Sequence, residues 1–160
     1  LAAAGIVLAV YYGDEIGMSG ENDPGCRKAM DWRGADMELL SYYETLTALR
    51  RAEPALRTGA FATVLCQENA YGFVRRLGGE TVYALFNRSD AEATLRVPAL
   101  ETHGLVRSLL GERAYTLEPL DFNEINDRFY RFDRMRYRSS FSVVLPAYGA
   151  EILKIKEETV

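Results

Sequence analysis

The spacing of apolar residues changes twice along the chain, and each change predicts a different kind of element. Residues 5 to 12, GIVLAVYY, form an unbroken apolar run with β-branched and aromatic members. Such a run is typical of a strand buried on both faces, as in a parallel barrel sheet. A helix over residues 1 to 10 is the alternative. A lone strand would leave backbone groups unpaired, so we expect the first dozen residues to dock against this chain's own helix or strands, or to pair with a second copy.

A long polar loop and an amphipathic helix are predicted next. Residues 13 to 35 contain five glycines and one proline, and a loop of this length in a compact domain usually has a function. Asp36 can cap the following helix, which Pro54 ends after about four turns. The apolar positions at helical spacing are Leu39, Leu40, Tyr43, Leu46 and Leu49.

From Gly59 onward the apolar period shortens toward two, which is typical of strands in an antiparallel β-sandwich. The Gly78-Gly79 pair predicts a tight hairpin, because glycine readily adopts the positive φ angles that such turns need. Residues 87 to 90 predict another turn. The alternating runs cover residues 60 to 66, 70 to 77, 80 to 87, 92 to 97, 105 to 110 and 141 to 156.

Four segments resemble the alpha-amylase family of glycoside hydrolases, most closely its neopullulanase, cyclomaltodextrinase and maltogenic amylase branch. They are YYGDEIGM at 11 to 18, NDPGCR at 22 to 27, ALRRAEPALRTGAF at 48 to 61 and LPAYGAEILK at 145 to 154. In that branch the first segment ends the eighth barrel strand and the second lies in the loop that follows.

The resemblance implies a mainly β fold with two parts. Residues 1 to 56 would be the C-terminal remnant of a catalytic (β/α)8 barrel, comprising its last strand, loop and helix. Residues 57 to 160 would be the C-terminal domain, an antiparallel Greek-key β-sandwich. The parent enzyme would hydrolyse or transfer α-glucosidic bonds of maltooligosaccharides, cyclodextrins or pullulan. We therefore expect the chain to be a fragment that docks on an upstream barrel.

Asp14 and Glu15 are adjacent carboxylates, but they are poor candidates for a catalytic pair. Neighbouring side chains on an extended segment point in different directions, whereas the two carboxyl groups of a glycosidase face one bond. The family takes its nucleophile, its acid/base and its third carboxylate from earlier barrel strands, and those motifs do not occur here. We predict no catalytic residue in this chain and no sugar cleavage by the chain alone.

Asp23 and Arg27 stand four residues apart on either side of Pro24-Gly25. A carboxylate accepts hydrogen bonds from sugar hydroxyls and a guanidinium donates several in fixed directions. From the residues alone, a surface salt bridge that stiffens the loop is favoured. The resemblance reverses this preference, because the matching residues of the related branch face the donor-side sugars. Asp23 and Arg27 are therefore the predicted substrate-binding residues.

The remaining motifs favour structural explanations. The loop glycines fit neither a dinucleotide nor a P-loop spacing, and the acidic loop lacks the EF-hand pattern, so we predict no cofactor and no metal. Trp32 suits sugar stacking and sealing a barrel rim equally well. His103 is expected to be an exposed loop residue. Residues 128 to 138, RFYRFDRMRYR, suit a solvated or charge-protected strand pair better than a nucleic-acid platform.

Composition narrows the possible partners. The chain has 160 residues, 48% hydrophobic content and a net charge of -4, which gives no electrostatic reason to expect nucleic acid or an anionic membrane. Cys26 and Cys66 fit two free thiols, although a disulfide stays open. The predicted partners are an α-glucan, the upstream barrel and a second copy of the chain, and the cytoplasm is the favoured compartment.

A rival hypothesis is a self-standing carbohydrate-binding or scaffold module with no enzymatic parent. Such a module would need exposed aromatic side chains on one sheet face. The candidates are Tyr71, Phe73, Tyr83 and Phe86, although their alternation fits core packing equally well.

Overall fold

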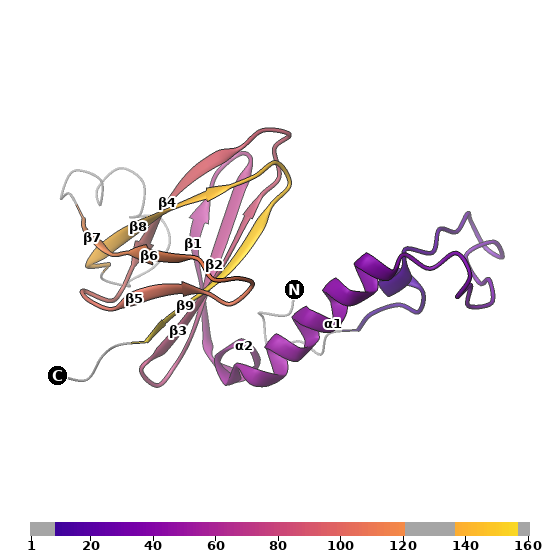
Figure 1. The fold of residues 1–160 in the computed structure, drawn as a ribbon, viewed down its shortest axis with the longest axis horizontal. Coiled ribbons are helices and arrows are strands. Elements are labelled where there is room, and N and C mark those ends of the chain that lie inside the picture. Colours follow the sequence, from indigo (N-terminus) through magenta and orange to yellow (C-terminus); the bar gives the residue numbers. More distant parts are fainter. Residues whose placement is uncertain (1–8, 121–136, 157–160) are drawn as a thin grey trace. The chain divides into compact units, whose positions relative to one another are not determined.

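The computed structural model describes residues 9–120 and 137–156, and the chain divides into two compact units, Leu1–Arg57 and Thr58–Val160. The first unit contains a short 3-10 helix, η1 (Asp14–Ile16), and the helix α1 (Met37–Ala52). A second short helix, α2 (Pro54–Thr58), follows α1. Figure 1 shows the long irregular loop between η1 and α1.

The helix α1 begins and ends where the sequence predicts. Asp36 is its N-cap, and Arg50 and Arg51 lie in its last turn, where positive charge is favourable beside the unpaired carbonyl groups. Pro54 follows the C-cap residue Glu53, which is extended, as residues before proline usually are. No residue of α1 is fully buried.

The predicted strand over residues 5 to 12 lies largely outside the described residues. Its described end, residues 9–12, has no strand structure, and Val10, Tyr11 and Tyr12 are exposed. A parallel strand needs a parallel neighbour, whereas every strand pairing among residues 9–120 and 137–156 is antiparallel. The docking expected for the first dozen residues stays a prediction.

The second unit is built from two antiparallel sheets, which confirms the predicted mainly β fold. The larger sheet has the order β1-β2-β3-β9-β5-β6 and the smaller one the order β4-β8-β7 (Figure 1). The strands are β1 (Ala60–Cys66), β2 (Ala70–Leu77), β3 (Glu80–Asn87), β4 (Ala93–Ala99), β5 (Leu105–Ser108), β6 (Ala114–Thr116), β7 (Glu118–Pro119), β8 (Ser139–Leu145) and β9 (Ala150–Lys156).

Strands β1 to β3 form two successive hairpins, and the chain then crosses to the smaller sheet at β4. The tight turn at Gly78-Gly79 occurs as predicted, with Leu77 paired to Glu80 and Gly78 at a φ of 60°. Strand β9 returns between β3 and β5, which is the type of non-local connection found in Greek-key folds. Strand β4 lies at the edge of its sheet, where the missing N–H of Pro98 is tolerated.

The apolar run over residues 141 to 156 is not one strand but two. Residues Pro146 to Gly149 form a turn in which the Gly149 N–H donates to the Pro146 carbonyl at 3.0 Å. Strand β8 before this turn belongs to the smaller sheet, and β9 after it belongs to the larger sheet. Apolar residues therefore alternate both before and after the turn, but the two strands belong to different sheets.

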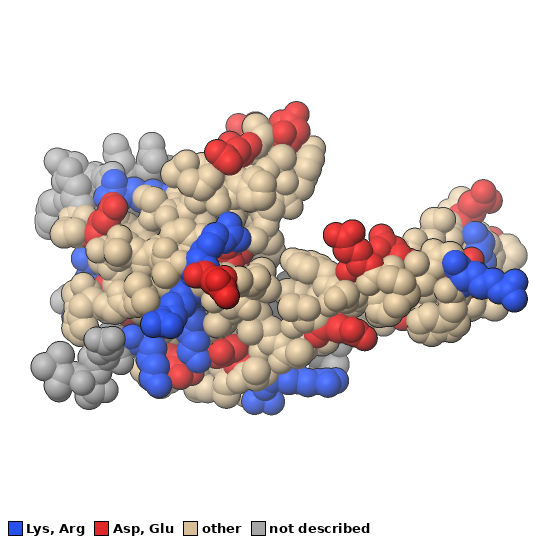
Figure 2. Space-filling view, viewed as in Figure 1, with Lys and Arg blue, Asp and Glu red and all other residues tan. Residues whose placement is uncertain are grey.

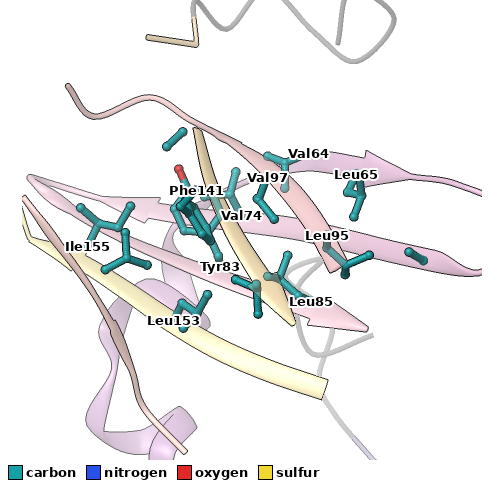
Figure 3. Close-up of a cluster of buried hydrophobic side chains, with 14 of the residues drawn as sticks. Val64, Leu65, Val74, Tyr83, Leu85, Leu95, Val97, Phe141, Leu153 and Ile155 are labelled. Carbon is teal, nitrogen blue, oxygen red and sulfur yellow. The ribbon is translucent and has the colours of Figure 1, made fainter. Parts of the chain in front are cut away.

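The core lies between the two sheets, with apolar side chains from both of them (Figure 3). Tyr83 of β3 meets Phe141 of β8 edge to face, with ring centroids 5.3 Å apart and an interplanar angle of 85°. Tyr83 is thus in the core, so the suggestion that it lies on an exposed aromatic face is wrong. It pairs with Val74, a core residue, whereas Tyr71 pairs with Phe86 on the opposite face.

Among the described residues of this unit two carboxylates are buried, and each has hydrogen-bond donors. Glu101 accepts from the hydroxyl of Thr81 and from that of Tyr83, the latter at 3.1 Å. Glu151 accepts from Ser108 Oγ at 2.7 Å and forms an ion pair with Arg113. These donors offset part of the free energy that burying a charged group costs.

We expect the stability of the sandwich to fall at alkaline pH because of Tyr83. Burial, and then the Glu101 carboxylate, raise the pKa of Tyr83 well above its usual range. The phenol therefore stays neutral in the folded chain while it ionises above about pH 10 in the unfolded chain, so stability is full below that pH and decreases above it. One such proton changes the free energy of unfolding by about 1.4 kcal/mol per pH unit.

Urea unfolding of the wild type and of Tyr83→Phe between about pH 8 and pH 11 measures this contribution. The other tyrosines are common to both proteins, so they cancel in the difference. The free energy of unfolding should fall less steeply for Tyr83→Phe above about pH 10. Parallel curves would show that Tyr83 ionises equally easily in both states.

Candidate functional site

The long loop begins at η1, which glycines and one carboxylate shape. Gly13 and Gly17 flank η1 with φ angles of 91° and 71°, a region that glycine adopts without strain. The Glu15 carboxylate accepts a hydrogen bond from the Gly13 N–H at 2.9 Å, so it holds the backbone of this turn. Ile16 is buried, whereas Asp14 is exposed.

The two ends of the loop meet at Asp36. Its backbone N–H donates to the Ile16 carbonyl at 3.0 Å, which joins the end of η1 to the start of α1. Its Oδ1 atom accepts from the backbone N–H groups of Glu38 and Leu39 at 3.1 and 2.9 Å. One residue therefore closes the loop and satisfies two of the four unpaired N–H groups at the start of the helix.

A second closure lies inside the loop. A Cβ atom on Gly20 would lie 2.8 Å from the Cα of Cys26, so only glycine allows these two backbone segments to approach so closely. Next to this crossing, Lys28 Nζ donates to the Ser19 carbonyl at 3.2 Å, and the Tyr12 hydroxyl donates to the Lys28 carbonyl at 3.0 Å. Residues 20 to 27 thus form a small tip whose two ends are held together by the Ser19–Lys28 bond.

The structure brings the predicted pair, Asp23 and Arg27, together at this tip. Arg27 Nη2 donates to Asp23 Oδ2 at 2.9 Å, and the two side chains are 60% and 69% exposed for Asp23 and Arg27 respectively. Two turns set their spacing, because the Gly25 N–H donates to the Asn22 carbonyl and the Arg27 N–H donates to the Pro24 carbonyl. The result is a solvated carboxylate and guanidinium presented side by side.

A cavity of about 190 Å³ lies beside the tip, and the sequence does not predict it. The Tyr11 and Tyr12 rings are 4.8 Å apart, with planes at 40°. The lining residues are Tyr11, Tyr12, Asp14, Met18, Ser19, Gly20, Cys26 and Lys28. Asp23 and Arg27 are outside this lining, so the pair and the cavity are neighbouring features. In the sequence, the one indication of this cavity is the pair of tyrosines, Tyr11 and Tyr12, just before Gly13.

Several other predicted residues occupy surface positions. Trp32 and His103 are exposed, and Thr102 Oγ1 lies 2.9 Å from His103 Nδ1. Cys26 and Cys66 are free and exposed. Most of the arginine-rich segment over residues 128 to 138 lies outside the described residues, which include only its last two positions.

The distribution of charged side chains on this surface does not favour a ligand of either sign. Acidic and basic side chains are intermixed on the face shown in Figure 2. In the described part of the chain, no three His, Cys, Asp or Glu side chains come together as a metal-binding group. No helix among the described residues combines the length and apolar character needed to cross a bilayer.

The relatives of known name to which this chain is similar include cyclomaltodextrinases. No protein-family model matches the chain. It is 42% identical over 110 residues to a cyclomaltodextrinase of Geobacillus thermopakistaniensis, covering 65% of this chain and 18% of that protein. It is 40% identical over 91 residues to a cyclomaltodextrinase of a Bacillus species, covering 54% of this chain and 16% of that protein. The chain thus matches less than a fifth of the length of these relatives.

A solved structure shares the fold over nearly the whole chain. The alpha-amylase from Geobacillus thermoleovorans, solved with acarbose, superposes with a TM-score of 0.73 and 26% identity, covering 93% of this chain and 29% of that one. The chain therefore shares the fold of part of a known alpha-amylase. More particularly, the chain resembles part of the alpha-amylase family of glycoside hydrolases, in the branch that includes the cyclomaltodextrinases.

We expect Asp36 to be the residue that orders the start of α1. Asp36→Ala should destabilise this helix end by about 1 kcal/mol, because two N–H groups lose their acceptor. Amide hydrogen exchange of the whole chain should show faster exchange at Glu38 and Leu39.

Asp36→Asn is the matched control, since asparagine caps helices about as well as aspartate. It should exchange like the wild type. Equal exchange in Asp36→Ala and Asp36→Asn would mean that the cap does not order this helix end.

Proposed function

We propose that this chain is the C-terminal portion of an alpha-amylase-like glycoside hydrolase acting on α-glucosidic bonds of maltooligosaccharides, cyclodextrins or pullulan. In this proposal residues 1 to 56 complete a catalytic barrel and residues 57 to 160 form the domain that follows it. The loop tip binds sugar through Asp23 and Arg27. The names of the relatives, which are cyclomaltodextrinases, support the substrate class.

The observation that carries the proposal is the geometry of the Asp23–Arg27 pair. An exposed ion pair stabilises a protein by about 0.2 to 1 kcal/mol, so stability is a weak reason for the pair. The close approach of Gly20 to Cys26 and the hydrogen bond between Asp36 and Ile16 restrict the conformations of the tip. A preordered carboxylate and guanidinium lose less conformational freedom when they bind a ligand rich in hydroxyls.

The same geometry supports the proposal that the chain does not cleave sugars by itself. A retaining glycosidase needs two carboxyl groups about 5 to 5.5 Å apart that face one bond. Asp14 and Glu15 are the two adjacent acids near the loop. The Glu15 carboxylate accepts a hydrogen bond from the Gly13 N–H, so Glu15 is not available to Asp14 as a second catalytic carboxylate. The tip adds two carboxylates, Glu21 and Asp23, and Asp23 is engaged with Arg27.

Calorimetric titration of the chain with maltoheptaose tests the binding role of the tip. Asp23→Ala and Arg27→Ala should each weaken binding at the tip by about tenfold, because a hydrogen bond to a charged group contributes about 1.5 to 3 kcal/mol. Both variants should keep the thermal stability of the wild type to within about 1 kcal/mol.

Glu80→Ala is the matched control, because it removes a carboxylate whose ion pair with Lys154 lies in the second unit. It should leave the affinity for maltoheptaose unchanged. If Asp23→Ala and Arg27→Ala bind like Glu80→Ala, the pair is a surface salt bridge and the proposed binding role is wrong.

A reducing-sugar assay tests the proposed inactivity of the chain. The purified chain incubated with β-cyclodextrin, maltoheptaose and pullulan should release no reducing ends above a protein-free blank. Release that is lost in Asp14→Asn or Asp23→Asn would locate a catalytic carboxylate in this chain and contradict the proposal.

A further inference from the structure

Lys28 is held through both its side chain and its backbone, and the two contacts reach different parts of the loop. Its Nζ atom donates to the Ser19 carbonyl at 3.2 Å, across the base of the tip formed by residues 20 to 27. Its own carbonyl accepts from the Tyr12 hydroxyl at 3.0 Å. Lys28 therefore joins the segment before the tip, the segment after it and the residues that precede η1.

Tyr12 lies next to a closely packed turn. The Met18 N–H donates to the Gly13 carbonyl at 2.9 Å, which closes the turn around η1. A Cβ atom on Gly13 would lie 2.7 Å from the sulfur of Met18, so the turn leaves no room for a larger residue. Because Tyr12 directly precedes Gly13, its hydroxyl links Lys28 to this packed turn.

The position of Lys28 matters because Lys28 directly follows Arg27. Gly20 and Cys26 approach closely within the tip, but a packing contact has little directional preference. The hydrogen bond from Lys28 adds direction, since such bonds weaken steeply when their angle changes. Fixing Lys28 therefore restricts the backbone of Arg27, whose Nη2 atom lies 2.9 Å from Asp23 Oδ2.

We propose that Lys28 is a positioning residue for sugar binding at the tip, which orders the Asp23–Arg27 pair and does not itself contact the sugar. The inference rests on the proposed function, because that function gives the pair its ligand. A tip that is ordered before binding loses less conformational entropy when the sugar binds. Loss of the bond that closes the tip raises this entropic cost and weakens binding.

Two features favour positioning over direct contact with the sugar. Lys28 lines the cavity beside the tip together with Ser19 and Tyr12, whereas Asp23 and Arg27 are outside this lining. Holding a long lysine side chain in one geometry also costs rotamer entropy, so an exposed lysine usually keeps its ammonium in water. Here the ammonium instead reaches a backbone carbonyl nine residues earlier.

Backbone ¹⁵N relaxation of the labelled 160-residue chain measures the order of the tip without any sugar. In the wild type, the order parameters of residues 20 to 27 should approach the value of about 0.85 that is typical of rigid backbone. Lys28→Met keeps an unbranched side chain but removes the donor, so these values should fall toward about 0.6. Lys28→Arg should retain the order, because a guanidinium can also donate to a carbonyl.

Calorimetric titration of the same variants with maltoheptaose measures the consequence for binding. Lys28→Met should weaken binding by about fivefold, the effect expected for the loss of one hydrogen bond. Lys28→Arg should bind within about twofold of the wild type. Tyr12→Phe removes only the hydroxyl that holds the Lys28 carbonyl, so it should lower both the affinity and the order of the tip.

Lys156→Met is the matched control, because Lys156 is an exposed lysine at the end of β9 in the second unit. It removes the same charge without touching the loop. Neither the order of the tip nor the affinity for maltoheptaose should change in this variant. Both methionine variants should keep the unfolding temperature of the wild type, because both lysines are exposed.

Order and affinity together decide the outcome. Unchanged order parameters in Lys28→Met would overturn the inference, and a loss of affinity without a loss of order would mean that the Lys28 ammonium contacts the sugar. Lower order with unchanged affinity would also overturn it, since binding would then not depend on an ordered tip. The proposed function fails separately, if Asp23→Ala and Arg27→Ala keep the wild-type affinity.

Discussion

The position of the loop tip depends on one backbone hydrogen bond, from the Asp36 N–H to the Ile16 carbonyl. Twenty residues separate these partners, and without the bond the loop would lose its common base. The same aspartate caps α1, so the rigid helix fixes one end of the loop and the buried Ile16 fixes the other. Farther along the loop, Gly20 and Cys26 approach closely at the base of the tip that carries the Asp23–Arg27 pair. An exposed and highly polar segment is ordered in this way by very few contacts.

Much of the second unit follows from the sequence because one face of each long strand is buried. Alternation identifies β1, β2 and β3 at the observed bounds, and Gly78-Gly79 identifies the hairpin between the last two. Alternation does not reveal which sheet a strand joins, so residues 141 to 156 resemble one strand although β8 and β9 lie in different sheets. Pairing partners far along the chain decide that question.

Buried charges are the second kind of feature that local patterns do not predict. Glu101 and Glu151 are surrounded by residues typical of exposed strands and turns, yet both are buried. Their donors come from other segments: Thr81 and Tyr83 for Glu101, and Ser108 and Arg113 for Glu151. At the loop, by contrast, Asp23 and Arg27 are four residues apart, and two local turns bring them together. The cavity beside them depends on the path of the backbone, which the polar composition leaves undetermined.

The place of β9 has a consequence for how the sandwich assembles. Among the described residues this strand is the last one in sequence, yet it lies inside the larger sheet, hydrogen-bonded to β3 on one side and β5 on the other. Hairpins β1–β2 and β2–β3 can form as soon as they leave the ribosome, but β5 and β6 cannot join them until residues 150 to 156 have been synthesised. Until then β3 has an unpaired edge with apolar residues beside it, a surface that promotes aggregation. The final strand therefore completes the sheet and also protects the strands made before it.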